Sequence, residues 1–131
     1  MKSLVISLFL AAAFQVNAAQ VEMGKYKAID VDTRSVDASF ELFADGSVIF
    51  NVTTPDFTMP APGCKGKYTV VENKFKADMT CPTDLLPEVS VDIDISNVNP
   101  QSIRTPEGAL VPVIIDALGD EPTMFLLKKN D

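Results

Sequence analysis

The chain has 131 residues, of which 47% are hydrophobic, and its 11 Lys and Arg against 18 Asp and Glu give a formal net charge of −7. This length fits one domain, and the composition is that of a globular protein, which excludes wholesale disorder. The absence of His excludes serine triads, Cys-His dyads and imidazole metal sites, and the acidic balance argues against nucleic acid and anionic lipid as partners.

The N-terminal segment has the layout of a cleaved export signal. Lys2 gives a positive start, residues 4–14 form an apolar stretch (LVISLFLAAAF), and a V-N-A tripeptide ending at Ala18 supplies a cleavage site. The stretch is too short to span a bilayer, and no later apolar run approaches that length. We therefore expect a signal peptide over 1–18 and a single periplasmic or secreted domain over 19–131. The alternative is a buried N-terminal helix.

The remaining chain consists of short alternating apolar and polar runs separated by turn residues, without helical periodicity beyond two turns. This pattern is typical of an all-β sandwich or barrel. We expect a single antiparallel meander of about eight strands that forms a small barrel or half-open barrel. The expected strands cover about residues 22–30, 37–43, 47–54, 64–71, 74–81, 89–95, 110–116 and 123–129.

The first well-defined hairpin turns at an Asp-Gly pair. A three-residue loop over 44–46 pairs Phe40 with Phe50 and gathers apolar side chains on one face, whereas a two-residue turn would mix apolar and polar side chains. The pattern therefore predicts a type I turn in which Gly46 adopts a left-handed conformation within a bulge.

The second hairpin predicts a disulfide. A turn at Glu72 and Asn73, where Asn tolerates a positive φ, aligns apolar residues on one face and places Cys64 opposite Cys81. Hydrophobic pattern and cysteine positions are independent, and they agree on one register. The alternative is a redox or metal pair, but the spacing is far from C-x-x-C and no His can complete a zinc site.

The C-terminal half is less regular. Pro112 lies inside an expected strand, which suggests an edge or a bulge. The apolar runs 113–115 and 125–127 place hydrophobic residues on both faces of their strands. One face fills the barrel, and the other is covered by a loop, by a partner or by nothing.

Three short motifs resemble the compact lipocalin-like, calycin-type barrels of bacterial envelopes. They are G-K-Y at 24–26, F-E-L-F-A-D-G-S-V at 40–48, and G-K-Y-T-V at 66–70 followed by N-K-F at 73–75. Tyr26 stands where lipocalins have Trp, and the likeness covers about half of the expected domain. The resemblance implies a barrel that holds a small apolar ligand or lipid. Small bacterial inhibitors of secreted proteases share a similar barrel plan with one disulfide.

Several large residues are expected to face the barrel interior, which is either a ligand cavity or filled by these side chains. Tyr26 and Tyr68 are its candidate polar groups. The candidate cavity residues are Tyr26, Phe40, Leu42, Phe50, Tyr68, Phe75 and Met79.

The proline-rich segment 53–63 (TTPDFTMPAPG) carries Phe57 and Met59, two apolar side chains in an expected loop. It is a candidate lid or recognition loop. Alternatively, it folds back and buries both residues.

No residue set points to catalysis or to a cofactor. Acidic clusters near Asp30, Asp92 and Asp116 lack the spacing of a calcium loop, so we interpret them as solvated strand faces and turns. No nucleophile, phosphate-binding or zinc motif is present. We expect a non-enzymatic protein without metal or cofactor that binds a small apolar ligand in its barrel. The alternative is an interaction or inhibitor module with a filled core, acting through its apolar outer face and the 53–63 loop.

Overall fold

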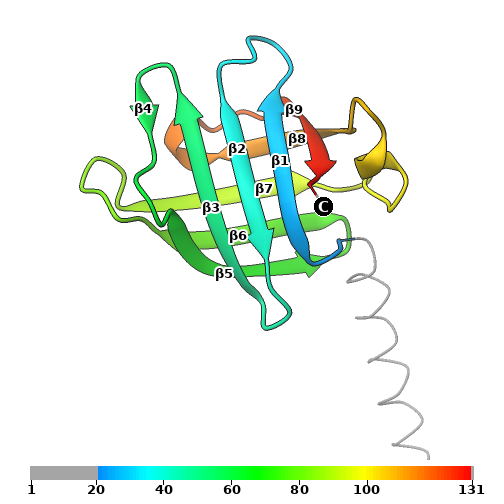
Figure 1. Cartoon of the computed structure of the whole chain (residues 1–131), viewed down its shortest axis with the longest axis horizontal. Coiled ribbons are helices and arrows are strands. Elements are labelled where there is room, and N and C mark those ends of the chain that lie inside the picture. Colours follow the sequence, from blue (N-terminus) through cyan, green and yellow to red (C-terminus); the bar gives the residue numbers. More distant parts are fainter. Residues whose placement is uncertain (1–20, 131) are drawn as a thin grey trace, which may run out of the picture.

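A computed structural model describes residues 21–130, which form a closed antiparallel β-barrel of eight strands (Figure 1). A ninth, two-residue strand, β4 (Phe57–Thr58), pairs only with the end of β3. Two short 3-10 helices, η1 (Ser102–Arg104) and η2 (Asp116–Leu118), lie in loops. The expected signal peptide lies outside the described residues. The barrel strands are β1 (Gly24–Asp30), β2 (Asp37–Leu42), β3 (Ser47–Thr54), β5 (Cys64–Val71), β6 (Lys74–Thr80), β7 (Glu88–Asp94), β8 (Ala109–Ile115) and β9 (Thr123–Lys129).

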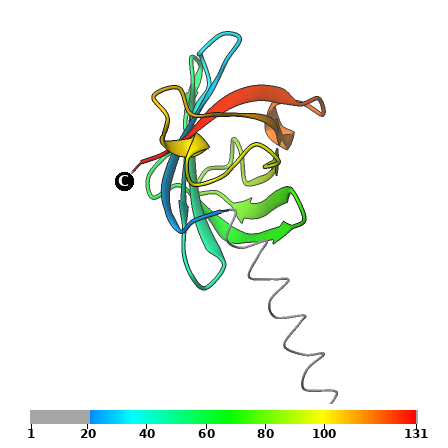
Figure 2. The same ribbon diagram turned by 90° about the vertical axis from the view of Figure 1, so that its right-hand side faces the viewer.

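The barrel is a closed meander. Each barrel strand pairs with the next one along the chain, and β9 returns to β1, where Ala28 lies opposite Leu127. Strands β1 to β3 form one wall, and the remaining strands curve round to face it (Figure 2). The prediction of an all-β meander is confirmed, and closure of the ring rules out the sandwich and the half-open barrel.

Both predicted hairpin registers are confirmed. Phe40 lies opposite Phe50, and Gly46 has a φ of 88° with its N–H donated to the Phe43 carbonyl at 3.1 Å. In the second hairpin Val70 lies opposite Phe75. One detail is wrong: the positive φ there falls on Glu72 (56°), and Asn73 is not among the positive-φ residues of the described chain.

The predicted disulfide is confirmed. Cys64 and Cys81 are joined with an S–S distance of 2.09 Å, and their Cα atoms lie 4.1 Å apart. Lys67 lies opposite Asp78 on the outer face of the same hairpin, as the register requires.

Pro112 is paired with Met124 of β9, but on its other side the ladder between β7 and β8 ends at Val113. It therefore borders an unpaired stretch within a closed ring.

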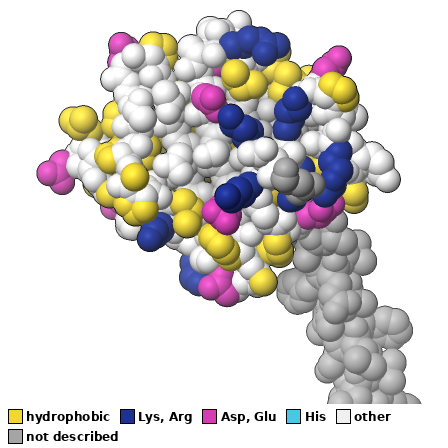
Figure 3. Space-filling view, viewed as in Figure 1, with side chains coloured by type: hydrophobic (Ala, Val, Ile, Leu, Met, Phe, Trp, Pro, Cys, Tyr) yellow, Lys and Arg dark blue, Asp and Glu magenta, His cyan; other side chains and the backbone are white. Residues whose placement is uncertain are grey.

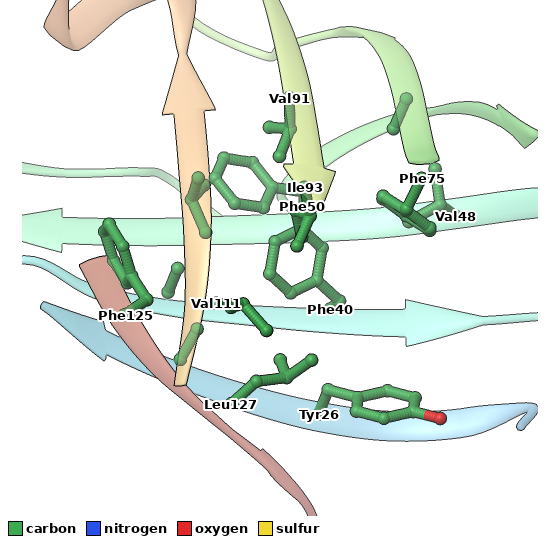
Figure 4. Close-up of a cluster of buried hydrophobic side chains, with 14 of the residues drawn as sticks. Tyr26, Phe40, Val48, Phe50, Phe75, Val91, Ile93, Val111, Phe125 and Leu127 are labelled. Atoms are coloured by element: carbon green, nitrogen blue, oxygen red, sulfur yellow. The ribbon is translucent and has the colours of Figure 1, made fainter. Parts of the chain in front are cut away.

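Aromatic and branched side chains fill the barrel (Figure 4). Phe50 has no exposed surface, and its ring centroid lies 5.0 Å from that of Phe40. Phe40 in turn meets the edge of Phe75 at 6.1 Å. A small pocket among these core side chains has a volume of about 20 Å³ and apolar walls that include Tyr26 and Leu127. Such a space is comparable to one water molecule, so the interior is filled by side chains.

One acidic residue departs from the expected solvated role. Asp30, at the end of β1, is only 2% exposed. Its carboxylate accepts hydrogen bonds from the backbone N–H groups of Thr33 (2.7 Å), Arg34 (3.0 Å) and Val36 (2.8 Å). Burial raises the pKa of Asp30, but these hydrogen bonds together outweigh burial and hold the pKa below its usual value. Asp30 therefore organises the loop between β1 and β2.

We expect Asp30→Asn to destabilise the protein at neutral pH and much less in acid. A carboxyl whose pKa is lowered by folding stabilises the fold fully above its unfolded pKa of about 3.9 and loses this effect as the pH falls through the folded value. The difference in free energy of unfolding between wild type and variant, measured with urea, should therefore be smaller at pH 3 than at pH 7. The control is Asp32→Asn, at an exposed neighbour, and its free energy of unfolding should stay close to that of wild type. If Asp30→Asn lowers the free energy of unfolding equally at pH 3 and pH 7, the stabilising role of the ionised Asp30 carboxylate is contradicted.

Candidate functional site

An apolar pocket of about 190 Å³ lies at one end of the barrel, and we call it the end pocket. Three segments that are far apart in the sequence form its walls: β3 with β4, the loop 81–87, and the end of β8 with η2. These segments gather at the left of Figure 1, and Figure 3 shows hydrophobic side chains clustered there. The lining residues are Val52, Thr54, Phe57, Leu85, Leu86, Ile115, Ala117 and Leu118.

The disulfide lies at the base of two of these walls. Cys64 begins β5 directly after the 55–63 loop, and Cys81 begins the 81–87 loop. The sulfur of Met59 lies 3.6 Å from the sulfur of Cys64, and the Cys81 N–H donates to the Pro87 carbonyl at 2.8 Å. The crosslink therefore ties together the loops that present Phe57 and the two leucines at 85 and 86.

The third wall is fixed by a carboxylate. Asp116, the first residue of η2, accepts a hydrogen bond from the backbone N–H of Ser90 in β7 at 2.9 Å. The Gly119 N–H donates to the Asp116 carbonyl at 3.4 Å and closes the short helix. Leu118 is thereby held at the pocket by a link between two separate parts of the barrel.

Two leucines beside the end pocket are unusually exposed. Leu85 is 83% exposed and Leu118 is 53% exposed, whereas Val52 and Ile115 beneath them belong to the buried core. Burying a leucine side chain completely contributes about 1.5–3 kcal/mol, and neither of these two gains the full contribution in the isolated chain. The site therefore has an apolar floor and exposed apolar edges, which is typical of a surface that binds an apolar partner group.

The candidate lid residues have separate positions. Phe57 is half-buried in β4 and lines the end pocket, whereas Met59 is 5% exposed and packs against the disulfide. The 53–63 loop therefore folds back over Met59 and presents Phe57. The sequence reasoning missed Leu85, Leu86 and Leu118. The Leu-Leu pair between Pro82 and Pro87, outside any predicted strand, was the available signal.

The candidate cavity residues all come together, but around the filled interior. Tyr26 is buried and donates its hydroxyl to the Glu22 carbonyl at 2.6 Å. Tyr68 is half-buried and donates to the Phe43 carbonyl at 3.1 Å. Burial, followed by the nearby Asp45 carboxylate, raises the pKa of the Tyr68 hydroxyl, which therefore stays a donor at neutral pH. The remaining candidates, Phe40, Leu42, Phe50, Phe75 and Met79, are buried in the core.

The outer surface has a second, polar depression of about 260 Å³ over β1, β2 and β3. Lysine and glutamate side chains line it together, so its charge favours no single class of ligand. Among residues 21–130, no group of three or more Cys, His, Asp or Glu residues is arranged to hold a metal ion. In the same range, no helix has the length and apolar character needed to cross a bilayer.

Comparisons of the chain with protein-family models, with curated proteins and with solved structures give no match.

Proposed function

We propose that this chain is an exported, non-enzymatic interaction module of inhibitor type that binds another protein through the end pocket. The observation that carries the proposal is the location of the apolar space: about 190 Å³ at the barrel end, against about 20 Å³ inside. A side chain of a partner fits the first space. A ligand of ordinary size, which needs about 300 Å³ or more, fits neither without rearrangement.

Two further features support a role outside the cytoplasm. The expected signal peptide over 1–18 would direct the chain to the periplasm or the exterior. The disulfide between Cys64 and Cys81 is consistent with an oxidising compartment. A lipocalin-like carrier of a small apolar molecule is the competing function, and it requires the barrel interior to open.

Leu85→Ser combined with Leu118→Ser tests the proposal. Because both side chains are already more than half exposed, we expect the free energy of unfolding to change by no more than about 0.5 kcal/mol. Partner binding should be lost, since exposed apolar anchors at the centre of an interface dominate its energy. The measurement is native mass spectrometry of the mature protein from an exporting host, for wild type and variant.

The matched control replaces exposed apolar residues away from the pocket, Val71→Ser with Leu110→Ser, which are 61% and 43% exposed. It should retain a co-purified protein that the pocket variant loses. A monomer that carries a small adduct and no protein would overturn the proposal and favour the carrier function. So would a protein partner that the control loses and the pocket variant keeps.

A further inference from the structure

We infer that the end pocket receives a cationic protein segment: one apolar anchor side chain flanked by Lys or Arg. This inference rests on the proposed function and names the chemistry of the partner. The loops at this end of the barrel, 31–36, 55–63, 81–87 and 116–122, carry six acidic residues and one basic residue, Arg34. The acidic residues are Asp32, Asp56, Asp84, Asp116, Asp120 and Glu121.

Four acidic residues that stand within three positions of a lining residue along the chain form what we call the acidic rim: Asp56, Asp84, Asp120 and Glu121. All four are exposed. Asp56 precedes Phe57 and Asp84 precedes Leu85, so each of these two carboxylates directly precedes an apolar lining residue in the sequence. No salt bridge recorded within residues 21–130 involves the rim, since the two present join Lys74 to Asp94 and Arg104 to Glu22.

Acidic residues on the barrel wall, unlike those of the rim, lie opposite basic residues. Asp78 lies opposite Lys67 and Asp92 lies opposite Lys76 in the strand registers, so these carboxylates face cations across the sheet. On the face that Figure 3 shows, most lysine and arginine side chains lie over the centre and right of the molecule, and others lie at its lower left. The rim carboxylates therefore flank an apolar centre without an ion pair to any described residue.

This arrangement selects among possible occupants. A second copy of the chain would bring the same carboxylates against the rim, and an anionic membrane or a fatty acid would also be repelled. A cationic segment is attracted, and rim charges of this kind raise the association rate and the specificity of an interface. The pocket volume of about 190 Å³ is suited to a Leu or Phe side chain rather than to a larger group.

Three synthetic peptides test the inference: KGKLFKGK, its charge-reversed counterpart EGELFEGE, and KGKSSKGK, which lacks the apolar anchor. Binding to the mature protein is followed by amide chemical shifts. We expect KGKLFKGK to perturb Leu85 and Leu118 and to bind about tenfold more tightly than either other peptide. Its affinity should fall several-fold between about 50 and 200 mM salt, because exposed charges are screened.

A rim variant, Asp84→Asn with Asp120→Asn and Glu121→Gln, should abolish the preference for the cationic peptide. The control variant, Glu41→Gln with Glu72→Gln and Glu107→Gln, removes the same charge away from the pocket and should keep it. Equal binding of KGKLFKGK and EGELFEGE at the pocket would overturn the cationic partner and leave the proposed function intact. If neither anchor-bearing peptide perturbs the pocket, both fail.

Discussion

Replacing Gly66 by Ala is expected to lower the free energy of unfolding by about 3 kcal/mol or more. Gly66 lies in β5 between Val48 of β3 and Met79 of β6. A Cβ atom at this position would clash with the backbone carbonyl oxygen of Asp78 and would lie 2.8 Å from the Cα of Met79. Both obstacles are backbone atoms of a paired strand, so neither can move without breaking the ladder between β5 and β6.

Urea unfolding of the mature protein measures this effect, and Gly46→Ala is the control. Gly46 has a φ of 88° but no atom within 4 Å of an added Cβ, so its substitution costs only backbone strain, about 1 kcal/mol. A Gly66→Ala effect no larger than that of Gly46→Ala would show that β5 and β6 do not approach this closely. The comparison of the two losses in free energy of unfolding therefore tests the barrel geometry, whatever the total stability of the protein.

Gly66 also matters to the site, because it lies two residues after Cys64. The close approach of β5 and β6 continues into the disulfide at the loop end of the barrel. A clash at Gly66 would separate these strands next to the crosslink that carries the pocket loops. We therefore expect the same variant to weaken binding at the end pocket along with stability.

The barrel strands were predictable because their signals are local. Alternation with a period of two assigns each residue to a face, and a turn of known length fixes the register. Thus Phe40 opposite Phe50 and Cys64 opposite Cys81 followed from the sequence alone. Whether the interior is filled depends on how the side chains pack, and alternation along the strands carries no information about that packing. The filled core around Phe50 therefore required the structure.

The end pocket depends on non-local geometry. Phe57, Leu86 and Leu118 belong to three loops, and only closure of the ring brings those loops to one place. The two-residue strand that contains Phe57 is too short to leave a periodic signal. Asp30 was misread for a related reason, since its burial depends on how the following loop folds over it.

Removal of the disulfide by Cys64→Ala with Cys81→Ala is the second large effect, and it should lower the free energy of unfolding by about 3 kcal/mol. The two cysteines are 17 residues apart, so the crosslink restricts a loop of that length in the unfolded chain. For a domain of this size, the loss corresponds to a fall in melting temperature of about 10 to 15 °C. Thermal and urea unfolding of the oxidised protein and the variant measure both quantities.

The same double variant separates stabilisation of the fold from preorganisation of the site. The strand register that opposes residues 64 and 81 is specified by apolar patterning, so the barrel should still form at low temperature. The loops 55–63 and 81–87 lose their shared anchor, and ordering them on binding then costs free energy. We expect weaker binding of KGKLFKGK at a temperature where the variant is fully folded. Unchanged affinity there would mean that Met59 and the barrel core alone hold the pocket walls in place.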